Sequence, residues 1–208
     1  MKRILTHIIL ATTALIMLSW PLTLGARDEE DIYELSLDDN LLTPEIKNDK
    51  QADKIQDFQY DMAEAFSRSN YDVEVMRDNE VIVITIPASQ LFEPNDTVVT
   101  KVGQELLKPF QRMLKTPGLY KILLVMHSDN TGSSAYTLNL TRQRVNAVFD
   151  WFDENGSVDY VVPYALGDTD PLVDNNSVEN RKINRRLEIY LVPEKIMLQQ
   201  AKKGRIRL

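Results

Sequence analysis

The chain has 208 residues, of which 43% are hydrophobic and 26% charged, a composition typical of one soluble domain of ordinary size with additional tails. It contains no cysteine, which excludes a disulfide framework and argues against lipid attachment through an N-terminal cysteine. Its net charge of −7 makes it a poor partner for nucleic acid, whose binding depends on neutralising phosphates.

Residues 1–26 have the features of a targeting segment. Lys2 and Arg3 precede an apolar stretch, and the small residues Gly25 and Ala26 suit a cleavage site. We expect a cleaved signal peptide, whose loss of Lys2 and Arg3 would change the net charge from −7 to −9. An uncleaved anchor is the alternative, because the stretch reaches the length of about 20 residues that spans a bilayer.

Residues 27–50 are acidic and lack a clear period, so we expect a solvated linker. Its apolar residues leave room for a short element that docks on a partner: Ile32, Leu35, Leu37, Leu41 and Leu42. The predicted domain occupies residues 51–193, and a basic tail at 194–208 is expected to be a frayed, solvent-exposed helix.

The predicted domain begins with a helix over residues 52–69, followed by a hairpin with strands at 71–75 and 81–86 and a turn at Asp78 and Asn79. The helix has one apolar stripe that suits core packing: Ile55, Phe58, Met62 and Phe66.

A second helix is predicted over residues 98–115, after a loop in which Asp96 is expected to provide the cap. Pro109 predicts a kink near Glu105, because an interior proline removes a hydrogen bond at a cost of about 3 kcal/mol. The expected core face consists of Val98, Val102, Leu106, Phe110, Met113 and Leu114.

A buried strand is predicted over residues 122–126, and it ends in a polar loop at 127–132. A helix that begins near Ser134 would place Thr137, Thr141 and Arg144 on one face. Side chains lean toward the N-terminus of a helix, so the Arg144 guanidinium would lie over the loop. The buried stripe expected for this helix, which should stop at Gly156, is Leu138, Val145, Phe149 and Phe152.

Asp129 in the loop and Arg144 on the helix could together form a small pocket with a fixed anion and a fixed cation. Such a pocket suits a zwitterion, whose ammonium would pair with Asp129 and whose carboxylate would bind Arg144 in a bidentate manner. Hydroxyl groups near the expected pocket belong to Ser128, Thr131 and Thr137.

Strands are also predicted at 158–166 and 186–192, on either side of a long polar loop at 167–181. Helices therefore alternate with strands. This alternation predicts an α+β fold, an α/β sandwich in which helices pack on a mixed sheet.

Four motifs mark the second half of the chain: HSDNTGSSAYTLNLTRQR at 127–144, GDTDP and NSVENR within 167–181, and NRRLEI at 184–189. Together they resemble the peptidoglycan-binding domain of the OmpA-like family, over roughly residues 71–192. The resemblance implies a βαβαββ sheet preceded by an N-terminal helix. It also implies a ligand, the diaminopimelate of the cell-wall peptide, with Asp129 on its ammonium and Arg144 on its carboxylate.

The resemblance extends the set of candidate residues. The segment with the family's LF pair, here Leu91 and Phe92, lines its ligand site, so Glu93 or Asn95 could face the ligand, and the NRR motif adds Arg185. At Thr137 the family often has a ligand-contacting asparagine, so a shorter reach is expected there. The complete expected ligand-binding set is Asp129, Arg144, Ser128, Thr131, Thr137, Glu93 and Arg185.

Each of the two central residues also has an ordinary structural explanation. Asp129 could tighten a turn with Asn130 and Gly132, and Arg144 could pair with a surface carboxylate such as Asp150. Their joint occurrence in the family pattern favours ligand binding.

No enzyme and no cofactor is expected. Only His127 would remain after cleavage, and the chain lacks cysteine and a G-x-S-x-G motif, so the usual zinc sites and nucleophiles are missing. Asp168 and Asp170 could in principle cleave glycosidic bonds as a pair, but their polar loop gives no indication of an acid–base site.

The sequence thus predicts non-catalytic binding of peptidoglycan in the periplasm of a double-membraned bacterium, in association with the cell wall or outer membrane. One alternative is a membrane-anchored subunit that tethers a larger envelope machine to the wall, as in flagellar stator proteins that resemble this domain. Another is a protein-interaction module that has lost wall binding. An envelope or outer-membrane protein could bind through residues 27–57 or the C-terminal tail.

Overall fold

A computed structural model describes residues 32–44, 46, 48–77 and 80–208, and Asp31–Leu208 form one compact unit. The expectations for residues 1–26 and for the turn at 78–79 lie outside the described residues. In the part of the chain that is described, no helix is both long and apolar enough to cross a membrane.

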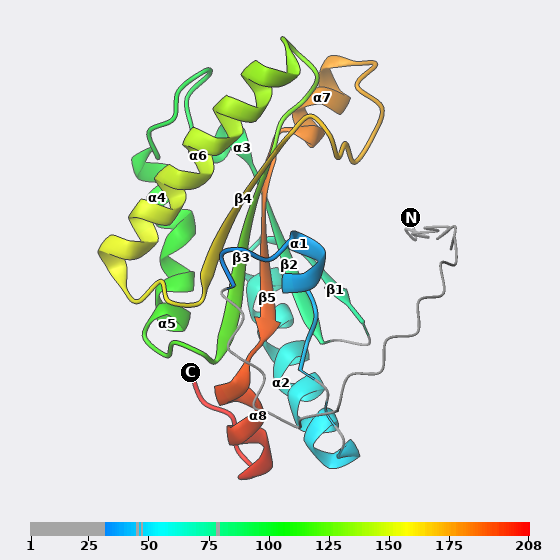
Figure 1. Ribbon diagram of the computed structural model, residues 1–208, viewed down its shortest axis with the longest axis vertical. Helices are drawn as coiled ribbons and strands as arrows, with labels where there is room; N and C mark the ends of the chain where they lie inside the picture. The colour runs from blue at the N-terminus through cyan, green and yellow to red at the C-terminus, as the bar shows by residue number, and fades with distance from the viewer. Residues whose placement is uncertain (1–31, 45, 47, 78–79) are drawn as a thin grey trace, which may run out of the picture. The chain divides into compact units, whose positions relative to one another are not determined.

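Five strands form a single mixed sheet in the order β1-β2-β5-β3-β4 (Figure 1). β3 and β4 are parallel, and the other neighbouring pairs are antiparallel. From β2 onward the chain follows the predicted βαβαββ order except for a short additional helix before β5, and the α+β fold class is confirmed. The strands are β1 (Asp72–Met76), β2 (Val81–Pro87), β3 (Tyr120–His127), β4 (Val161–Gly167) and β5 (Arg186–Pro193).

The main core lies between one face of the sheet and a set of helices. Alternate residues of β3 and β5, such as Leu124 and Ile189, point into this core, as the two-residue period of a strand requires. All eight residues of β3 are buried, which explains its continuous apolar run. Helices that contribute to this core include α2 (Asp49–Arg68), α4 (Lys101–Leu107), α5 (Gln111–Leu114), α6 (Ser134–Asn155) and α8 (Lys195–Lys202).

The helix predicted over residues 98–115 is divided into three pieces. Its first piece, α4, begins at Lys101 because the Thr100 hydroxyl accepts a hydrogen bond from the Gly103 N–H at 3.0 Å. Asp96 was predicted to be the cap, but its carboxylate accepts hydrogen bonds from the N–H groups of Thr97 and Val98, in the turn that precedes α4. A 3₁₀ segment, η1 (Lys108–Phe110), follows at Pro109 and leads into α5, so the predicted kink takes the form of a tighter turn.

Part of the core face predicted for this helix is wrong. Val98 and Val102 are 67% and 66% exposed, whereas Gly103 and Leu107 are buried. Gly103 lies against a short helix that the sequence did not predict, α3 (Ala88–Leu91), where an added Cβ would meet the Leu91 backbone at 3.0 Å.

Helix α6 has the predicted bounds, with Ser133 as its N-cap and Gly156 at its C-cap. Val145 and Phe152 are buried as predicted, and Phe149 packs partly against the core. Leu138 was also predicted to be buried, but it is 38% exposed.

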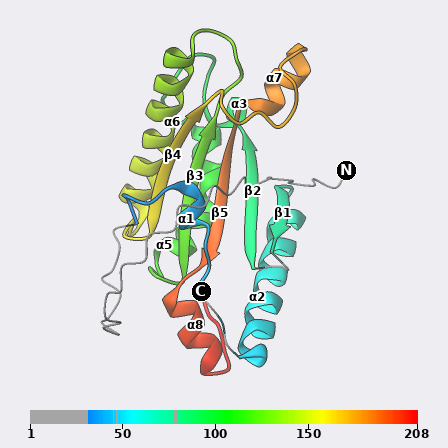
Figure 2. The same ribbon diagram turned by 45° about the vertical axis from the view of Figure 1, so that its right-hand side comes forward.

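The opposite face of the sheet is covered by residues 32–44, which we call the strap. In both views its short helix α1 (Leu37–Asn40) lies across the middle strands (Figures 1 and 2). Asn40 is fully buried and donates hydrogen bonds to the Ile32 carbonyl at 2.6 Å and the Tyr164 hydroxyl at 2.7 Å. The strap side chains that pack on this face are Ile32, Leu37 and Leu41. This part of the expected solvated linker therefore packs on the domain's own sheet.

Two other polar segments are more ordered than predicted. The loop at 167–181 leads into a helix, α7 (Val178–Asn184), at one end of the sheet. The C-terminal tail forms α8, at the other end of the sheet. Met197 and Ala201 of α8 are buried in the main core, so the prediction of a solvent-exposed helix is wrong.

Candidate functional site

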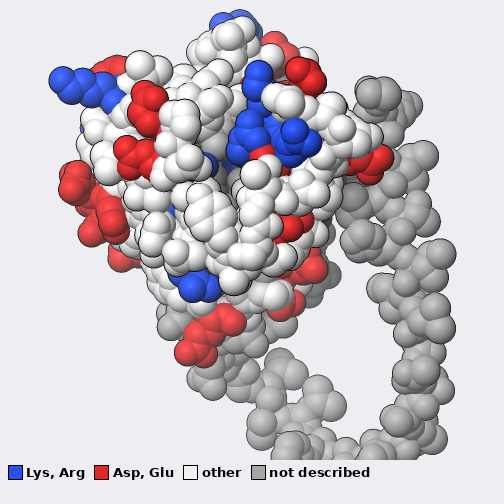
Figure 3. All heavy atoms as spheres, turned by 90° about the horizontal axis from the view of Figure 1, so that it is seen from above, with Lys and Arg blue, Asp and Glu red and all other residues white. Residues whose placement is uncertain are grey.

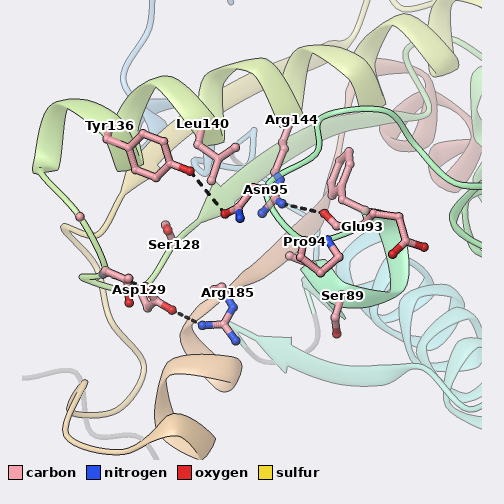
Figure 4. A pocket seen from close by; sticks show the side chains of 14 residues that line it. Ser89, Glu93, Pro94, Asn95, Ser128, Asp129, Tyr136, Leu140, Arg144 and Arg185 are labelled. Carbon is pink, nitrogen blue, oxygen red and sulfur yellow. Dashed lines mark hydrogen bonds and ion pairs between the residues drawn. The ribbon is translucent and has the colours of Figure 1, made fainter.

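A pocket of about 590 Å³ opens where β3 ends, between the loop after α3, the loop after β3 and helix α6 (Figure 4). Figure 3 looks onto this end of the domain, where basic side chains gather beside a hollow and acidic ones are spread around it. Six of the seven predicted site residues line the pocket: Glu93, Ser128, Asp129, Thr131, Arg144 and Arg185.

Arg144 reaches the pocket from α6 and is largely buried. Its Nε donates to the Asp96 carbonyl at 2.9 Å, and its guanidinium carbon lies 5.0 Å from the centre of the Phe92 ring. Burial lowers the pKa of Arg144, but a guanidinium remains charged at neutral pH. Arg144 therefore presents a positive charge held by backbone carbonyls and an aromatic face, not by Asp150.

Asp129 lies across the pocket from Arg144, and its side chain is only 3% exposed. One carboxylate oxygen accepts from the Thr131 N–H at 2.7 Å, and the other forms an ion pair with Arg185. Burial alone would raise the pKa of Asp129, but the bonds from Thr131 and Arg185 outweigh it and lower the pKa. Asp129 is therefore an ionised group that both tightens the loop and holds an arginine.

The pocket has an amphipathic wall that the sequence reasoning missed. Tyr136 and Leu140 line it together with Arg144, and the Tyr136 hydroxyl donates to Asn95 Oδ1 at 3.5 Å (Figure 4). These three residues of α6 are spaced by four, so the helical period could have identified this face. Asn95 has a positive φ of 58°, which turns the loop after Phe92 back toward α6.

Thr137 is not among the residues that line the pocket. It is fully buried, and its hydroxyl donates to Asp168 Oδ1 at 2.8 Å. The Thr141 hydroxyl also faces β4, because it accepts a hydrogen bond from the N–H of Gly167 at the end of that strand. The single face predicted for Thr137, Thr141 and Arg144 is therefore two faces, one toward β4 and one toward the pocket.

A buried polar network lies at the same end of the sheet, on β5 and the end of β3. Arg186 Nε donates to Glu188 at 2.7 Å, Tyr190 donates to Glu188 at 2.5 Å, and His127 Nε2 is 3.4 Å from the same carboxylate. Burial opposes ionisation of Glu188, but His127 and Arg186 outweigh it and lower its pKa to about 2. The two arginines of the NRR motif thus differ, since Arg185 lines the pocket and Arg186 is buried.

The described residues contain no group of three histidine, cysteine or acidic side chains placed to hold a metal ion. The residues that line the pocket offer fixed charges, hydroxyl groups and apolar surface. Such a site can bind and orient a charged ligand.

Residues 91–185 match the family model of the OmpA family. Among curated proteins, the peptidoglycan-binding protein ArfA of Mycobacterium tuberculosis is 31% identical over 88 residues, which are 42% of this chain and 27% of ArfA. The chain spans less than two thirds of the length of the curated relatives that it matches.

Solved structures also resemble the domain, among them two with TM-scores above 0.5 and high coverage. A MotB-like protein from Desulfovibrio vulgaris has a TM-score of 0.61 and 22% identity, over 69% of this chain and 99% of that protein, which shows a shared fold. The cell wall anchor of the type VI secretion system (T6SS) from Pseudomonas aeruginosa has a TM-score of 0.54 and 27% identity, over 64% of this chain and 94% of the anchor.

Proposed function

Because residues 91–185 match the family model of the OmpA family, we propose that this protein binds peptidoglycan without catalysis and anchors itself to the cell wall in the periplasm. Two of its relatives carry names of this kind, the peptidoglycan-binding protein ArfA and the T6SS cell wall anchor. The chain itself contributes a pocket in which opposite charges face each other.

The observation that carries the proposal is the environment of Arg144. Its guanidinium is largely buried and opens into the pocket, and its recorded hydrogen bonds go to the carbonyls of Glu93 and Asp96. A buried cation of this kind binds a carboxylate strongly and with defined geometry. Arg144 is thus the receptor for the free carboxylate of diaminopimelate in the stem peptide, and Asp129 is the receptor for its ammonium.

The remaining lining suits the rest of this ligand. Phe92, Tyr136 and Leu140 offer apolar surface between the charged groups, against which the methylene groups of diaminopimelate would pack. Ser128 and Thr131 add polar groups at the Asp129 end.

Co-sedimentation of the full chain with insoluble peptidoglycan tests the proposal, with free diaminopimelate as competitor. Arg144→Gln should weaken binding by about 2 to 5 kcal/mol, because the ligand carboxylate is left unpaired. Asp129→Asn should weaken binding by a smaller amount, because the parent has to give up the pair between Asp129 and Arg185 when the ammonium binds. Arg142→Gln is the matched control, since Arg142 lies on the exposed side of the same helix. Peptidoglycan with lysine in place of diaminopimelate should bind weakly.

The site assignment fails if the Asp129 and Arg144 variants bind like the parent. If the folded parent itself does not sediment with peptidoglycan, wall binding is the wrong function, and a protein-interaction role becomes the better one. Circular dichroism of each variant separates loss of binding from loss of fold.

The likeness to the T6SS cell wall anchor favours a second candidate, a subunit that tethers a larger envelope machine to the wall. This function needs a membrane link or a partner in addition to the pocket. N-terminal sequencing of the exported protein distinguishes the two: a start near Arg27 indicates a free periplasmic protein, and Met1 indicates an anchored one.

A further inference from the structure

We propose that Arg185 occupies, in the free protein, the place at Asp129 that the ammonium of the ligand takes, so that binding exchanges one ion pair for another. This inference rests on the proposed function. It makes Arg185 a residue that sets how strongly the pocket distinguishes a zwitterion from a simple carboxylate.

The first observation is that both carboxylate oxygens of Asp129 already have partners. The Thr131 N–H takes one oxygen, and Arg185 Nη1 takes the other. Asp129 is buried, and in the close-up the Arg185 guanidinium points at it from the pocket side (Figure 4). An ammonium group that enters the pocket therefore meets Arg185 before it can pair with Asp129 alone.

The second observation is that the two ends of the pocket are unequal. Arg185 neutralises Asp129, whereas the recorded hydrogen bonds of Arg144 go to backbone carbonyls and its guanidinium also faces the Phe92 ring. Burial lowers the pKa of Arg144 most, and repulsion from Arg185 lowers it further, which agrees with two cations facing one pocket. A ligand carboxylate therefore gains a new ion pair with Arg144. A ligand ammonium gains an ion pair with Asp129 only by replacing the one that Arg185 already makes.

The third observation is that Arg185 can leave. Its side chain is 35% exposed, and it is the C-cap residue of the seven-residue helix α7, at the start of β5. A displaced guanidinium can therefore return to water at little cost. The ammonium then contributes only the difference between two similar ion pairs, which is small.

Calorimetric titration of the full chain with meso-diaminopimelate and with pimelate tests this exchange. Pimelate is the same seven-carbon dicarboxylate without ammonium groups. In the parent we expect the affinity for meso-diaminopimelate, divided by the affinity for pimelate, to be a small ratio. In Arg185→Gln the ratio should rise by about tenfold, because Asp129 then has no competing cation for the ligand's ammonium to displace. Lys182→Gln, an exposed charge removed from the same helix, should leave the ratio unchanged.

A measurement without ligand tests the starting state. Titration of the Asp129 carboxyl by nuclear magnetic resonance should give a higher pKa in Arg185→Gln than in the parent, because the ion pair lowers it. An unchanged pKa would mean that the two residues are not paired in the free protein.

The outcomes separate this inference from the proposed function. A parent that binds diaminopimelate, together with an unchanged or smaller ratio in Arg185→Gln, overturns only the exchange; a smaller ratio would mark Arg185 as a direct ligand contact. A folded parent that binds neither compound overturns the proposed function and the exchange together.

Discussion

Glu188 is a buried carboxylate whose charge is held by Arg186, Tyr190 and His127. Its pKa of about 2 in the folded protein lies below the value of an unfolded chain. A carboxyl with a lowered pKa stabilises the fold above its unfolded pKa, and this stability is lost as the pH falls toward the folded pKa. The loss here amounts to about 2 to 3 kcal/mol between pH 5 and pH 2.5.

Urea denaturation at these two pH values checks the prediction. The free energy of unfolding should fall by about 2 to 3 kcal/mol more in the parent than in Glu188→Gln, which cannot titrate at this position. The neighbouring groups His127, Asp170 and Arg186 remain in both proteins, so the difference isolates Glu188. An equal fall in the two proteins would contradict the role assigned to this carboxylate.

At the scale of residues, charge and spacing predicted that Asp129 and Arg144 share a pocket, but not how these side chains pair. Asp129 and Arg144 could be predicted because a strand, a loop and a helix of standard geometry bring them to one place. The pairing of Asp129 with Arg185 joins residues 56 positions apart, and only the sheet order brings β5 beside β3. Thr137 was wrongly predicted to line the pocket. It follows Tyr136 by one residue, and one residue turns a helix by about 100°, so its side chain points away from the face that Tyr136 shares with the pocket.

At the scale of elements, the junction between α6 and α5 is unusually close. Gly156 ends α6 as predicted, but its φ of 170° is extended and open to any residue. The reason for glycine is space, because an added Cβ would lie 2.4 Å from the Leu114 Cβ. Gly156→Ala should therefore cost about 1 to 3 kcal/mol of stability through overpacking.

A double-mutant cycle with Leu114→Gly measures this contact, because the atom that an alanine at 156 would meet is the Leu114 Cβ. Leu114→Gly alone should cost about 3 to 6 kcal/mol, since Leu114 is buried in the main core and glycine costs about 1 kcal/mol more than alanine in a helix. In the double variant the Cβ of residue 114 is absent, so the total cost should be smaller than the sum of the two single costs. Additive costs would show that the close approach at Gly156 does not limit packing.

Long periodic elements were predicted well and short ones were not. The periods of α2, β3 and α6 are visible because each element buries one face or both faces over eight residues or more. Helices α3 and α7 have four and seven residues, too few for a period to appear. The start of α4 depends on which side chain caps the backbone, and Thr100 provides this cap where Asp96 was predicted.

At the scale of the whole domain, the strap adds a covering layer to the second face of the sheet. Its buried Asn40 joins the strap's own backbone to Tyr164 of β4. Asn40→Ala should weaken the docking of the strap by about 1 to 3 kcal/mol, because the Ile32 carbonyl loses its partner.

Hydrogen exchange measures this effect where it occurs. The Leu41 N–H, which donates to the Leu37 carbonyl, should exchange about 10 to 100 times faster in Asn40→Ala than in the parent. Amides of β3 should keep their protection. Asp38→Ala, an exposed change on the same short helix, is the control. Equal protection in the Asn40 variant and the parent would mean that packing alone holds the strap.

The packing of both ends of the described chain could not be predicted from composition. The strap is acidic and α8 is basic, and charge alone indicates solvent exposure for each. Their few apolar residues, such as Leu37 and Met197, fill places that exist only once the sheet has formed.

Docking of the strap also limits how far its N-terminal end can lie from the domain. Its 13 residues lie along the sheet, and the same 13 residues fully extended would span roughly 45 Å. The Ile32 end of the strap is therefore held on the sheet while the strap is docked. If the strap undocked, its Ile32 end could lie up to roughly 45 Å from the domain, without any change in the pocket itself.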